Sequence, residues 1–544
     1  MLLFLAFVVA VSITAALIPV LERWAPVIGL TDPPGPRKVH STPVPRVGGL
    51  AMGIGLLIPT LLTVHLSPAA YGLVAGNLVL LLFGLWDDRK TLGYRTKFAG
   101  QIIAVALCMF IGGIRVGTVT IAGIDLFPGV ASTLLTFAFL IGVTNAVNLA
   151  DGLDGLAGGL VLLCLCAIAL FAATSDNTLV TALALIEAGA VLGFLRFNTH
   201  PARIFMGDSG SQVLGFSAGA LSLMATQSDT SPLSGALPLL LLGLPIVDTL
   251  TVMTARIRAG RSPFTADSNH LHHRLLALGF AHREAVLIIY VAQVALVLLA
   301  YFLRFSSDAT VLGAFLAFAG LALGFLHWAA RSGWRLHDSD KMGSMRRRWL
   351  NFMPTAHLPA LTLGVMTTCL VIYAAAVVTA SSRVTLDVGL LCLGMLLGLL
   401  VLSSWRVEGA LRWFERASAY VSVVMLVYLD QTTPDKPPMM TTLSWTLIGI
   451  TGVGALLRFC FSPTRRFEVT TFDLLVAFIA LVMPNLPGSI ALPPDLPAGI
   501  AKAVILLYVV EMLLTIDLKR LMPRVILIVM LAVIAGRALL GASA

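Results

Sequence analysis

The sequence has few charged residues. Asp, Glu, Lys and Arg make up 12% of its 544 residues, whereas hydrophobic residues make up 58%; about a quarter of a soluble globular domain is charged. Apolar runs of about twenty residues, long enough to cross a bilayer, recur along the whole chain. The composition therefore excludes an ordinary soluble domain and indicates an all-α, polytopic integral membrane protein.

Cysteine is also scarce, and its spacing matches no metal-binding motif. All six cysteines lie inside apolar runs, so we interpret them as small hydrophobic side chains. The first segment, "MLLFLAFVVAVSITAALIPVLERW", lacks a basic start and a small-residue cleavage site, which predicts a spanning helix and not a signal peptide. The formal charge of +9 is typical of basic cytoplasmic loops, and we expect no nucleic-acid partner.

Basic residues are unevenly divided between the two sets of loops. Residues 1–350 are predicted to contain about 11 spanning helices, one near 236–255. Loops on one side carry about 21 Lys and Arg, against about two on the other, which predicts a cytoplasmic first set and an outside N-terminus. The outside segment 114–129 alternates like a small β-hairpin. Residues 351–544 are predicted to form a separate module of about seven spans, including 470–484, of unknown role.

Carboxylates cluster where predicted spans end on the cytoplasmic side. They are Asp87 and Asp88, Asp151 and Asp154, and Asp208. Charged residues at the membrane are costly and therefore indicate function. Carboxylates converging at one face suit Mg²⁺, which also binds phosphates. The alternative is that each aspartate caps a helix.

The stretch "NAVNLADGLDGLAGG" (145–159) places polar residues at every third position. Asn145, Asn148, Asp151 and Asp154 would follow one side of a helix at this spacing. The glycines that follow allow backbone N–H groups to approach an anion. We therefore expect this stripe to face a phosphate-containing substrate.

The longest inside loop contains "SNHLHHRL". His270, His272, His273 and Arg274 suit phosphate oxygens and developing negative charge. A zinc site would need further ligands that the surrounding sequence does not supply. The remaining alternative is a solvated basic loop.

Two further side chains suit a phosphate or a nucleobase. Lys97 begins a predicted helix and can reach a phosphate or extend to the interface, and Phe205 can stack on a base or pack in the core. These residues together predict a Mg²⁺-dependent membrane enzyme that handles phosphates at the cytoplasmic face, with a lipid as one substrate.

Five motifs, in this order, resemble the polyprenyl-phosphate N-acetylhexosamine-1-phosphate transferases of glycosyltransferase family 4. The motifs are "DPPGPRKVHSTPVPRVGG", "DD" at 87–88, "NAVNLADGLDGLAGG", "FNTHPARIFMGDSGS" and "HLHHRLLALGF", and the resemblance covers about residues 1–325. The histidine motif is similar to that of the undecaprenyl-phosphate GlcNAc-1-phosphate branch. The phospho-MurNAc-pentapeptide branch has three consecutive histidines, which Leu271 interrupts here.

The resemblance implies transfer of GlcNAc-1-phosphate from UDP-GlcNAc to undecaprenyl phosphate, yielding polyprenyl-diphosphate-GlcNAc and UMP, with Mg²⁺ or, as a substitute, Mn²⁺. The catalytic residues that it implies are Asp87, Asp88, Asp208, His270, His272 and His273. The metal ligands that it implies are Asp208, Asp88 and Asp151. The residues that it implies for substrate binding are Lys97, Asn148, Asp151, Asp154, Asn198, Phe205, Arg274 and His40. The bacterial inner membrane is the expected location, and the reaction would begin cell-envelope polysaccharide assembly, such as that of O-antigen.

Three alternatives stay open. The same chemistry can use another UDP-HexNAc or UDP-MurNAc-pentapeptide. Buried carboxylates among many spans also suit an ion-coupled transporter, although here they lie at one interface and not at the midplane. The partners are the two substrates and membrane lipids, and a homodimer is left open.

Overall fold

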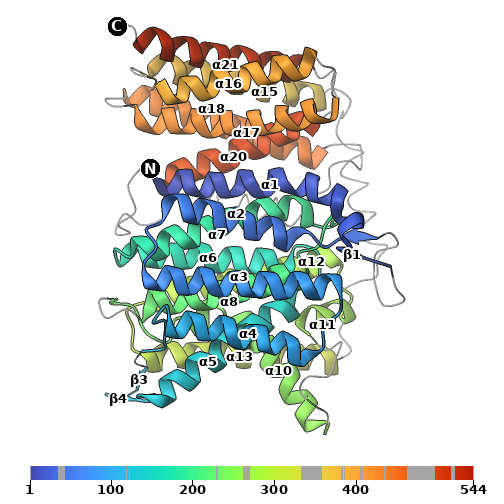
Figure 1. Cartoon of the computed structure of the whole chain (residues 1–544), viewed down its shortest axis with the longest axis vertical. Helices are drawn as coiled ribbons and strands as arrows, with labels where there is room; N and C mark the ends of the chain where they lie inside the picture. Colours follow the sequence, from blue (N-terminus) through green and yellow to red (C-terminus); the bar gives the residue numbers. More distant parts are fainter. Residues whose placement is uncertain are drawn as a thin grey trace. The chain divides into compact units, whose positions relative to one another are not determined.

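The computed structural model consists mainly of helices. It describes residues 2–34, 43–117, 119–121, 123–227, 231–260, 262, 270–332, 358–381, 384, 386–404, 408–433, 437–461, 496–515 and 521–542. These residues fall into two compact units, one on each side of the undescribed segment 333–357. Each unit is a bundle of helices, coloured blue to yellow and orange to red in Figure 1. The predicted boundary at residue 350 lies outside the described residues.

The first unit contains thirteen described helices. They are α1 (Leu2–Ile28), α2 (Gly48–Thr63), α3 (Pro68–Arg89), α4 (Tyr94–Phe110), α5 (Val130–Ala150), α6 (Leu156–Thr174), α7 (Thr178–Asn198), α8 (Gly207–Thr226), α9 (Pro238–Leu241), α10 (Gly243–Arg258), α11 (Leu271–Ala277), α12 (His282–Leu303) and α13 (Asp308–Arg331). Most of the long helices lie side by side, whereas α5 and α10 cross them obliquely (Figure 1).

Two short antiparallel pairs of strands connect helices of this unit. Strand β1 (Thr31–Asp32) pairs with β2 (Val44–Pro45). Strand β3 (Thr120–Ile121) pairs with β4 (Ile124–Asp125). The second pair confirms the hairpin predicted within residues 114–129.

Helices α6, α7 and α8 form the centre of the first unit. Their apolar faces are buried almost all the way round, as expected for helices surrounded by other helices. Small residues let α7 approach α1 closely: a Cβ added at Gly189 would lie 2.4 Å from the backbone oxygen of Phe7, and one at Gly193 would lie 2.7 Å from that of Val11. Backbone contact through small residues is how membrane helices pack tightly.

Eight described helices are long and apolar enough to span a membrane. Seven belong to the first unit and one to the second. This confirms a multi-pass, all-α membrane protein. The predicted totals of about eleven and seven spans remain predictions.

The span expected near 236–255 is interrupted. The structure has a short helix, α9, followed directly by α10, and the break lies at Leu242. Pro245 lacks a backbone N–H and therefore cannot donate back to the fourth preceding residue as a continuous helix requires. Hydrophobicity alone does not reveal such a break.

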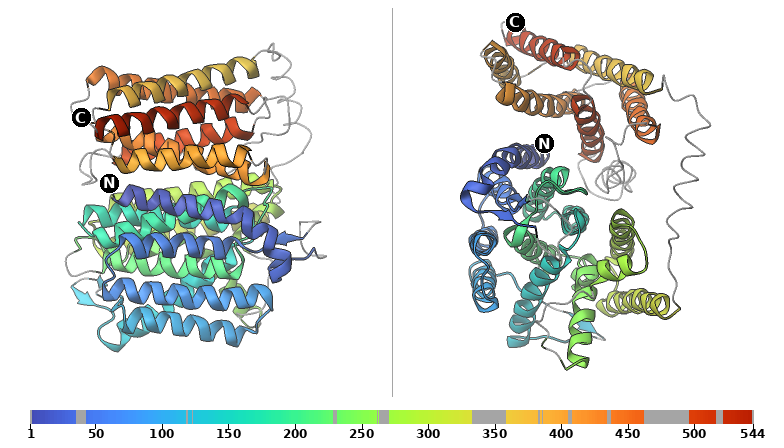
Figure 2. Two further views of the ribbon diagram at one scale, coloured as in Figure 1. Left: turned by 45° about the horizontal axis from the view of Figure 1, so that its top comes forward. Right: turned by 90° about the vertical axis from the view of Figure 1, so that its right-hand side faces the viewer.

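The second unit contains six described helices. They are α15 (Leu358–Ala380), α16 (Leu386–Ser404), α17 (Glu408–Thr432), α18 (Pro438–Phe461), α20 (Leu496–Thr515) and α21 (Leu521–Ala542), and Figure 2 shows them packed side by side. The predicted span 470–484 lies outside the described residues.

A buried ion pair holds four helices of this second unit together. Nζ of Lys502 on α20 lies 2.6 Å from Oδ2 of Asp430 on α17, and both side chains are almost fully buried. The same oxygen accepts hydrogen bonds from the hydroxyls of Ser444 on α18 and Tyr373 on α15. Buried charges are tolerated when they are paired in this way.

Candidate active site

The carboxylate of Asp88, in the last turn of α3, binds the first turn of α8. Its Oδ1 accepts a hydrogen bond from the backbone N–H of Asp208 at 2.8 Å. Its Oδ2 accepts from the N–H of Ser209 at 3.1 Å and from the hydroxyl of Ser209 at 2.7 Å. A negative charge here satisfies backbone donors that the helix start leaves unpaired. Asp88 therefore positions Asp208.

Glycine is required where the two helices meet. Gly207 has a φ of +67°, a conformation that side chains rarely adopt. A Cβ added there would lie 2.4 Å from Oδ2 of Asp88. The glycine before Asp208 therefore allows the carboxylate of α3 to reach the start of α8.

Lys97, in the first turn of α4, connects two aspartates. Its Nζ lies 2.7 Å from Oδ2 of Asp87 and 2.6 Å from Oδ2 of Asp208. Oδ1 of Asp87 accepts a hydrogen bond from the N–H of Leu92 at 2.6 Å. The Asp87 side chain is buried, whereas those of Asp208 and Lys97 are 28% and 31% exposed. The accessible part of the cluster is therefore Asp208 and the ammonium beside it.

The end of α5 supplies an amide to the same cluster. Nδ2 of Asn148 donates to Oδ1 of Asp208 at 3.2 Å and to the hydroxyl of Ser211 at 2.7 Å. One turn earlier, Asn145 exchanges hydrogen bonds with Gln101 of α4, which also donates to Gln212 of α8. This polar network joins α4, α5 and α8 beneath the carboxylates.

The predicted polar stripe does not continue along one helix. Helix α5 ends at Ala150, and Asp151 and Asp154 lie in the turn before α6. The chain leaves the helical conformation at Asp151, which has a φ of −77° and a ψ of +53°, and α6 begins only after Gly155, which has a φ of +80°. The expectation of a single helical face is therefore wrong for its second half.

Asp151 lies close enough to the cluster to be affected by its charge. Burial, and then the negative charges of Asp208 and Asp88, raise the pKa of Asp151 to about 7. The positive charge of Arg46 opposes this rise, and Arg46 also forms an ion pair with Asp32. The turn therefore brings another carboxylate toward the same site.

Asp154 contacts the connection between α7 and α8. Its Oδ2 lies 2.8 Å from Nδ1 of His200 and accepts from the N–H of Ala202 at 3.1 Å. Burial tends to raise the pKa of Asp154, but these hydrogen bonds outweigh it and hold the pKa below its usual value. Asn198 joins the same two segments: it accepts from the N–H of Gly155 at 3.0 Å and donates to the backbone oxygen of Ile204 at 2.9 Å.

The histidine motif forms a short helix beside this turn. His270 is buried, and its Nδ1 lies 3.0 Å from Oδ2 of Asp248 on α10. His272 packs against Gly152, since a Cβ added at Gly152 would lie 2.3 Å from its Nε2. Burial, and then the charge of His273, lower the pKa of His272 to about 4. His272 is therefore an uncharged imidazole at neutral pH.

Side chains from four separate helices therefore meet at one end of the first unit. The residues joined there by hydrogen bonds or ion pairs are Asp87, Asp88, Lys97, Asn148 and Asp208. Phe205 lies just before α8, where its backbone bonds to Pro45 and Gly48. His273 is exposed and Arg274 half-buried on α11, and His40 lies outside the described residues.

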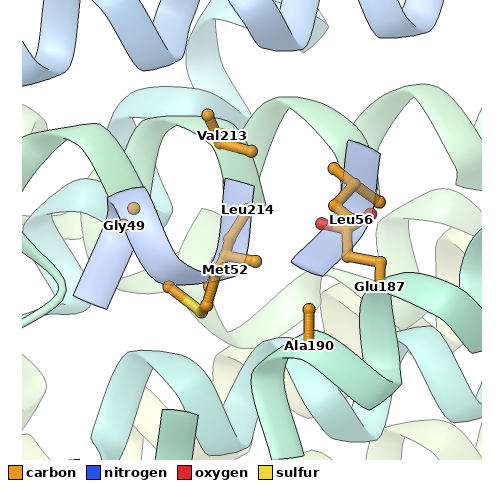
Figure 3. Close-up of a pocket in the computed structure, with 8 residues that line it drawn as sticks. Gly49, Met52, Leu56, Glu187, Ala190, Val213 and Leu214 are labelled. Carbon is orange, nitrogen blue, oxygen red and sulfur yellow. The ribbon is translucent and has the colours of Figure 1, made fainter. Parts of the chain in front are cut away.

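Sequence reasoning missed several residues of this region. Asp248 interrupts an apolar helix, which is itself a signal of function. Glu187 does the same in α7: it is buried, its Oε1 has no hydrogen-bond partner among the described residues, and it lines a small cavity beside Gly49 and Gly210. Figure 3 shows its carboxylate extending toward Leu56 of α2. Ser209 and Ser211 gave no signal in the sequence, because serine is common in packed membrane helices.

The cluster has the composition of a site for a hard divalent cation. Asp87 and Asp208 share the ammonium of Lys97, and the charges of Asp88 and Asp208 act on nearby Asp151, but among the described residues no three of these four carboxylates have oxygens within 4.8 Å of one another. Every candidate ligand atom is a carboxylate oxygen, which Mg²⁺ prefers. The residues at the ends of α3, α5 and α8 therefore fit such a cation by the chemistry of their donors, and Lys97 occupies the space between two of them.

A family profile described as "Glycosyl transferase family 4" matches residues 70–226. A probable undecaprenyl-phosphate N-acetylglucosaminyl 1-phosphate transferase of Bacillus subtilis is 37% identical over 289 residues, which cover 52% of this chain and 80% of that protein. A decaprenyl-phosphate N-acetylglucosaminephosphotransferase of Mycolicibacterium smegmatis is 39% identical over 317 residues, covering 52% of this chain and 78% of that protein. An Escherichia coli undecaprenyl-phosphate alpha-N-acetylglucosaminyl 1-phosphate transferase is 29% identical over 275 residues, covering 49% and 75%.

Proposed function

The chain belongs to glycosyl transferase family 4, and on that premise we propose that it transfers GlcNAc-1-phosphate from UDP-GlcNAc to a polyprenyl phosphate. The products are polyprenyl-diphosphate-GlcNAc and UMP. The observation that carries the proposal is the cluster of Asp87, Lys97, Asn148 and Asp208, assembled from the ends of α3, α4, α5 and α8. Its paired acidic and basic groups suit a reaction between two phosphate esters.

Positioning and charge neutralisation account for most of the catalysis of phosphoryl transfer. A Mg²⁺ held by Asp208, Asp87 and Asp151 would neutralise negative charge on the diphosphate of the nucleotide sugar. Asp87 replaces Asp88 in the ligand set expected from the sequence, because both carboxylate oxygens of Asp88 accept hydrogen bonds from the start of α8. Asp88 holds the backbone of Asp208 in place by accepting a hydrogen bond from its N–H at the start of α8. Lys97 lies on the accessible side of the cluster and orients an incoming phosphate oxygen. The oxygen of the lipid phosphate attacks the β-phosphorus, and UMP leaves.

The segment between α7 and α8 forms the nucleotide-sugar side of the site. Asn198 fixes this segment to the turn that contains Gly155. His272 lies against the same turn, and its uncharged imidazole can accept a hydrogen bond. Phe205 is half-buried beside the start of α8, where a nucleobase can stack on its ring.

The distribution of basic residues supports an orientation for the protein. The site lies among the loops that carry about 21 Lys and Arg, which favours the cytoplasmic face of a bacterial inner membrane. In this orientation the N-terminus is outside. All the proposed catalytic residues belong to residues 1–350, so this part is expected to suffice for the reaction.

The proposal is tested with the purified full-length chain, undecaprenyl phosphate and a panel of UDP-sugars. Release of UMP with UDP-GlcNAc, dependent on Mg²⁺ and accompanied by a labelled lipid product, is expected. A clear preference for UDP-MurNAc-pentapeptide would overturn the choice of sugar. Label that accumulates inside proteoliposomes without a lipid product would instead indicate a transporter.

The role of the first unit is tested by truncation after residue 350. The shortened chain should retain transfer activity in membranes, because the described contacts of the cluster lie within α3 to α12. Loss of activity in a well-inserted fragment would show that the second unit is part of the catalytic apparatus.

A further inference from the structure

Three metal-ligating side chains meet outside the carboxylate cluster. Asp154 belongs to the turn between α5 and α6, His200 to the connection between α7 and α8, and His282 to the first turn of α12. One ligand atom from each lies within 4.8 Å of those from the other two. The fold thus brings together groups separated by about 130 residues in sequence.

The two imidazoles are held side by side and next to the carboxylate. The rings of His200 and His282 stack, with centroids 4.2 Å apart and an angle of 25° between the planes. Nδ1 of His200 lies 2.8 Å from Oδ2 of Asp154. Nε2 of His282 is buried and has no hydrogen-bond partner among the described residues. An unsatisfied buried nitrogen is costly, so a partner that completes it would stabilise the fold.

We propose that Asp154, His200 and His282 form a binding site for a transition-metal ion of the Zn²⁺ class. Two imidazole nitrogens and one carboxylate oxygen are a ligand set typical of Zn²⁺, with a fourth position for water. Mg²⁺ prefers an all-oxygen set such as that around Asp208. The first unit therefore offers two chemically different cation sites.

The ion would occupy the space between the carboxylate and the two rings. It replaces the contact between Asp154 and His200 and takes the lone pair of Nε2 of His282. Both ligating nitrogens must be unprotonated, so metal binding weakens in acid, where protons compete with the ion. No electron transfer is involved, since Zn²⁺ has a single accessible oxidation state.

The consequence of binding is to fasten the turn between α5 and α6. Two other contacts already hold this turn: the N–H of Gly155 donates to Asn198 at 3.0 Å, and the hydroxyl of Tyr290 on α12 donates to the backbone oxygen of Gly155 at 2.6 Å. A metal bridge from Asp154 to His282 would join the same segments a third time. It would thereby restrict movement of Asp151, which lies in this turn.

The test uses the full-length chain, freed of metal with EDTA and then dialysed. We expect Co²⁺ to bind with about one equivalent per chain and to give the visible absorption of a four-coordinate ion, and Zn²⁺ to displace it. We also expect Zn²⁺ to raise the midpoint of thermal unfolding. Neither measurement depends on transfer activity, so the result is independent of the proposed function.

Size-matched variants locate the site. His200→Gln and His282→Gln should weaken Co²⁺ binding by a factor on the order of 100 or more, because each removes a ligand. His65→Gln, in the connection between α2 and α3, is the matched control and should bind as the original chain does. Unfolding midpoints measured in EDTA identify variants that fold normally, and Asp154→Asn takes the place of any that does not.

Two outcomes would overturn the proposal. One is an absence of saturable Co²⁺ binding and of any effect of Zn²⁺ on the unfolding midpoint. The other is retention of binding in folded His282→Gln together with its loss in His273→Gln, which would place the ion on the histidine motif of α11 instead.

Discussion

Replacing Asp88 by asparagine separates the structural role of this residue from the role of Asp208. The side chain keeps its shape but loses its charge and one acceptor oxygen. In the structure Oδ1 accepts from the N–H of Asp208 at 2.8 Å, and Oδ2 accepts from the N–H and hydroxyl of Ser209 at 3.1 and 2.7 Å. An asparagine that keeps its oxygen at the Oδ2 position points its own N–H groups at the N–H of Asp208.

The cost of Asp88→Asn follows from these contacts. Losing one charge-assisted hydrogen bond costs about 1.5–3 kcal/mol, and losing a negative charge at a helix start costs about 0.3–2 kcal/mol. A neutral amide is easier to bury beside Asp208, which offsets part of the loss. We expect the free energy of unfolding to fall by about 2–3 kcal/mol. Transfer activity should also fall, because the start of α8 is displaced.

The matched comparison is Asp208→Asn. The Asp208 side chain is partly buried, at 28% exposure, but Lys97 keeps its ion pair with Asp87 when Asp208 loses its charge, so no buried ammonium is left unpaired. Its free energy of unfolding should therefore change by less than about 1 kcal/mol. Its transfer rate should fall by a factor on the order of 1000 or more, because a charge facing the reacting phosphates is removed.

The assay is denaturant unfolding in mixed micelles containing EDTA, combined with UMP release at several Mg²⁺ concentrations. If Asp88→Asn unfolds at the same denaturant concentration as the original chain, the contacts with α8 do not stabilise it. If Asp208→Asn keeps a rate within a few-fold of the original chain, Asp208 only caps a helix. Either result would refute the assignment of these two roles.

Three further predictions concern pH, the second unit and a glycine. Burial and neighbouring carboxylates raise the pKa of Asp151 to about 7, so between about pH 4 and pH 7 the folded chain keeps a proton that the unfolded chain releases, and the midpoint of thermal unfolding should fall as the pH rises through this range. The midpoint of Asp151→Asn should fall less over the same range, and an equal fall would argue against a raised pKa. Lys502→Met should lower the free energy of unfolding by about 3–5 kcal/mol, because it leaves the buried carboxylate of Asp430 unpaired. Adding Asp430→Asn should recover most of this loss, and additive losses in the double variant would show that the two residues are not coupled. Gly207→Ala should unfold at a lower temperature and lose transfer activity, because Gly207 has a φ of +67° and an added Cβ would meet the carboxylate of Asp88. Gly93→Ala is the control: no atom lies within 4 Å of its added Cβ, so it should resemble the original chain in both measurements.

Local sequence features were sufficient to predict the class of protein and many of the polar groups. Apolar runs of spanning length predicted a helical membrane protein, because the bilayer requires about twenty apolar residues per crossing. Carboxylates are costly at a membrane, so their positions in the sequence alone identified Asp87, Asp88 and Asp208 as candidates. The β3–β4 hairpin was also predicted, because alternation between apolar and polar residues is itself local.

The pairing of these groups was decided by the tertiary structure. The contact between Asp88 and the start of α8 joins residues 120 positions apart, and that between Lys97 and Asp208 joins residues 111 positions apart. Helical periodicity identifies which residues share a face of one helix, but it contains no information about which helix ends meet.

The turn after α5 shows the same limit. Three-residue spacing placed Asn148 and Asp154 on one stripe, yet Asn148 binds Asp208 whereas Asp154 binds His200. The chain leaves the helix at Ala150, and the two side chains then face different segments. The sequence by itself determined which polar residues lie where predicted spans end. Only the packing of α3, α4, α5 and α8 decided which of them form the carboxylate cluster, because those contacts depend on helices distant in sequence.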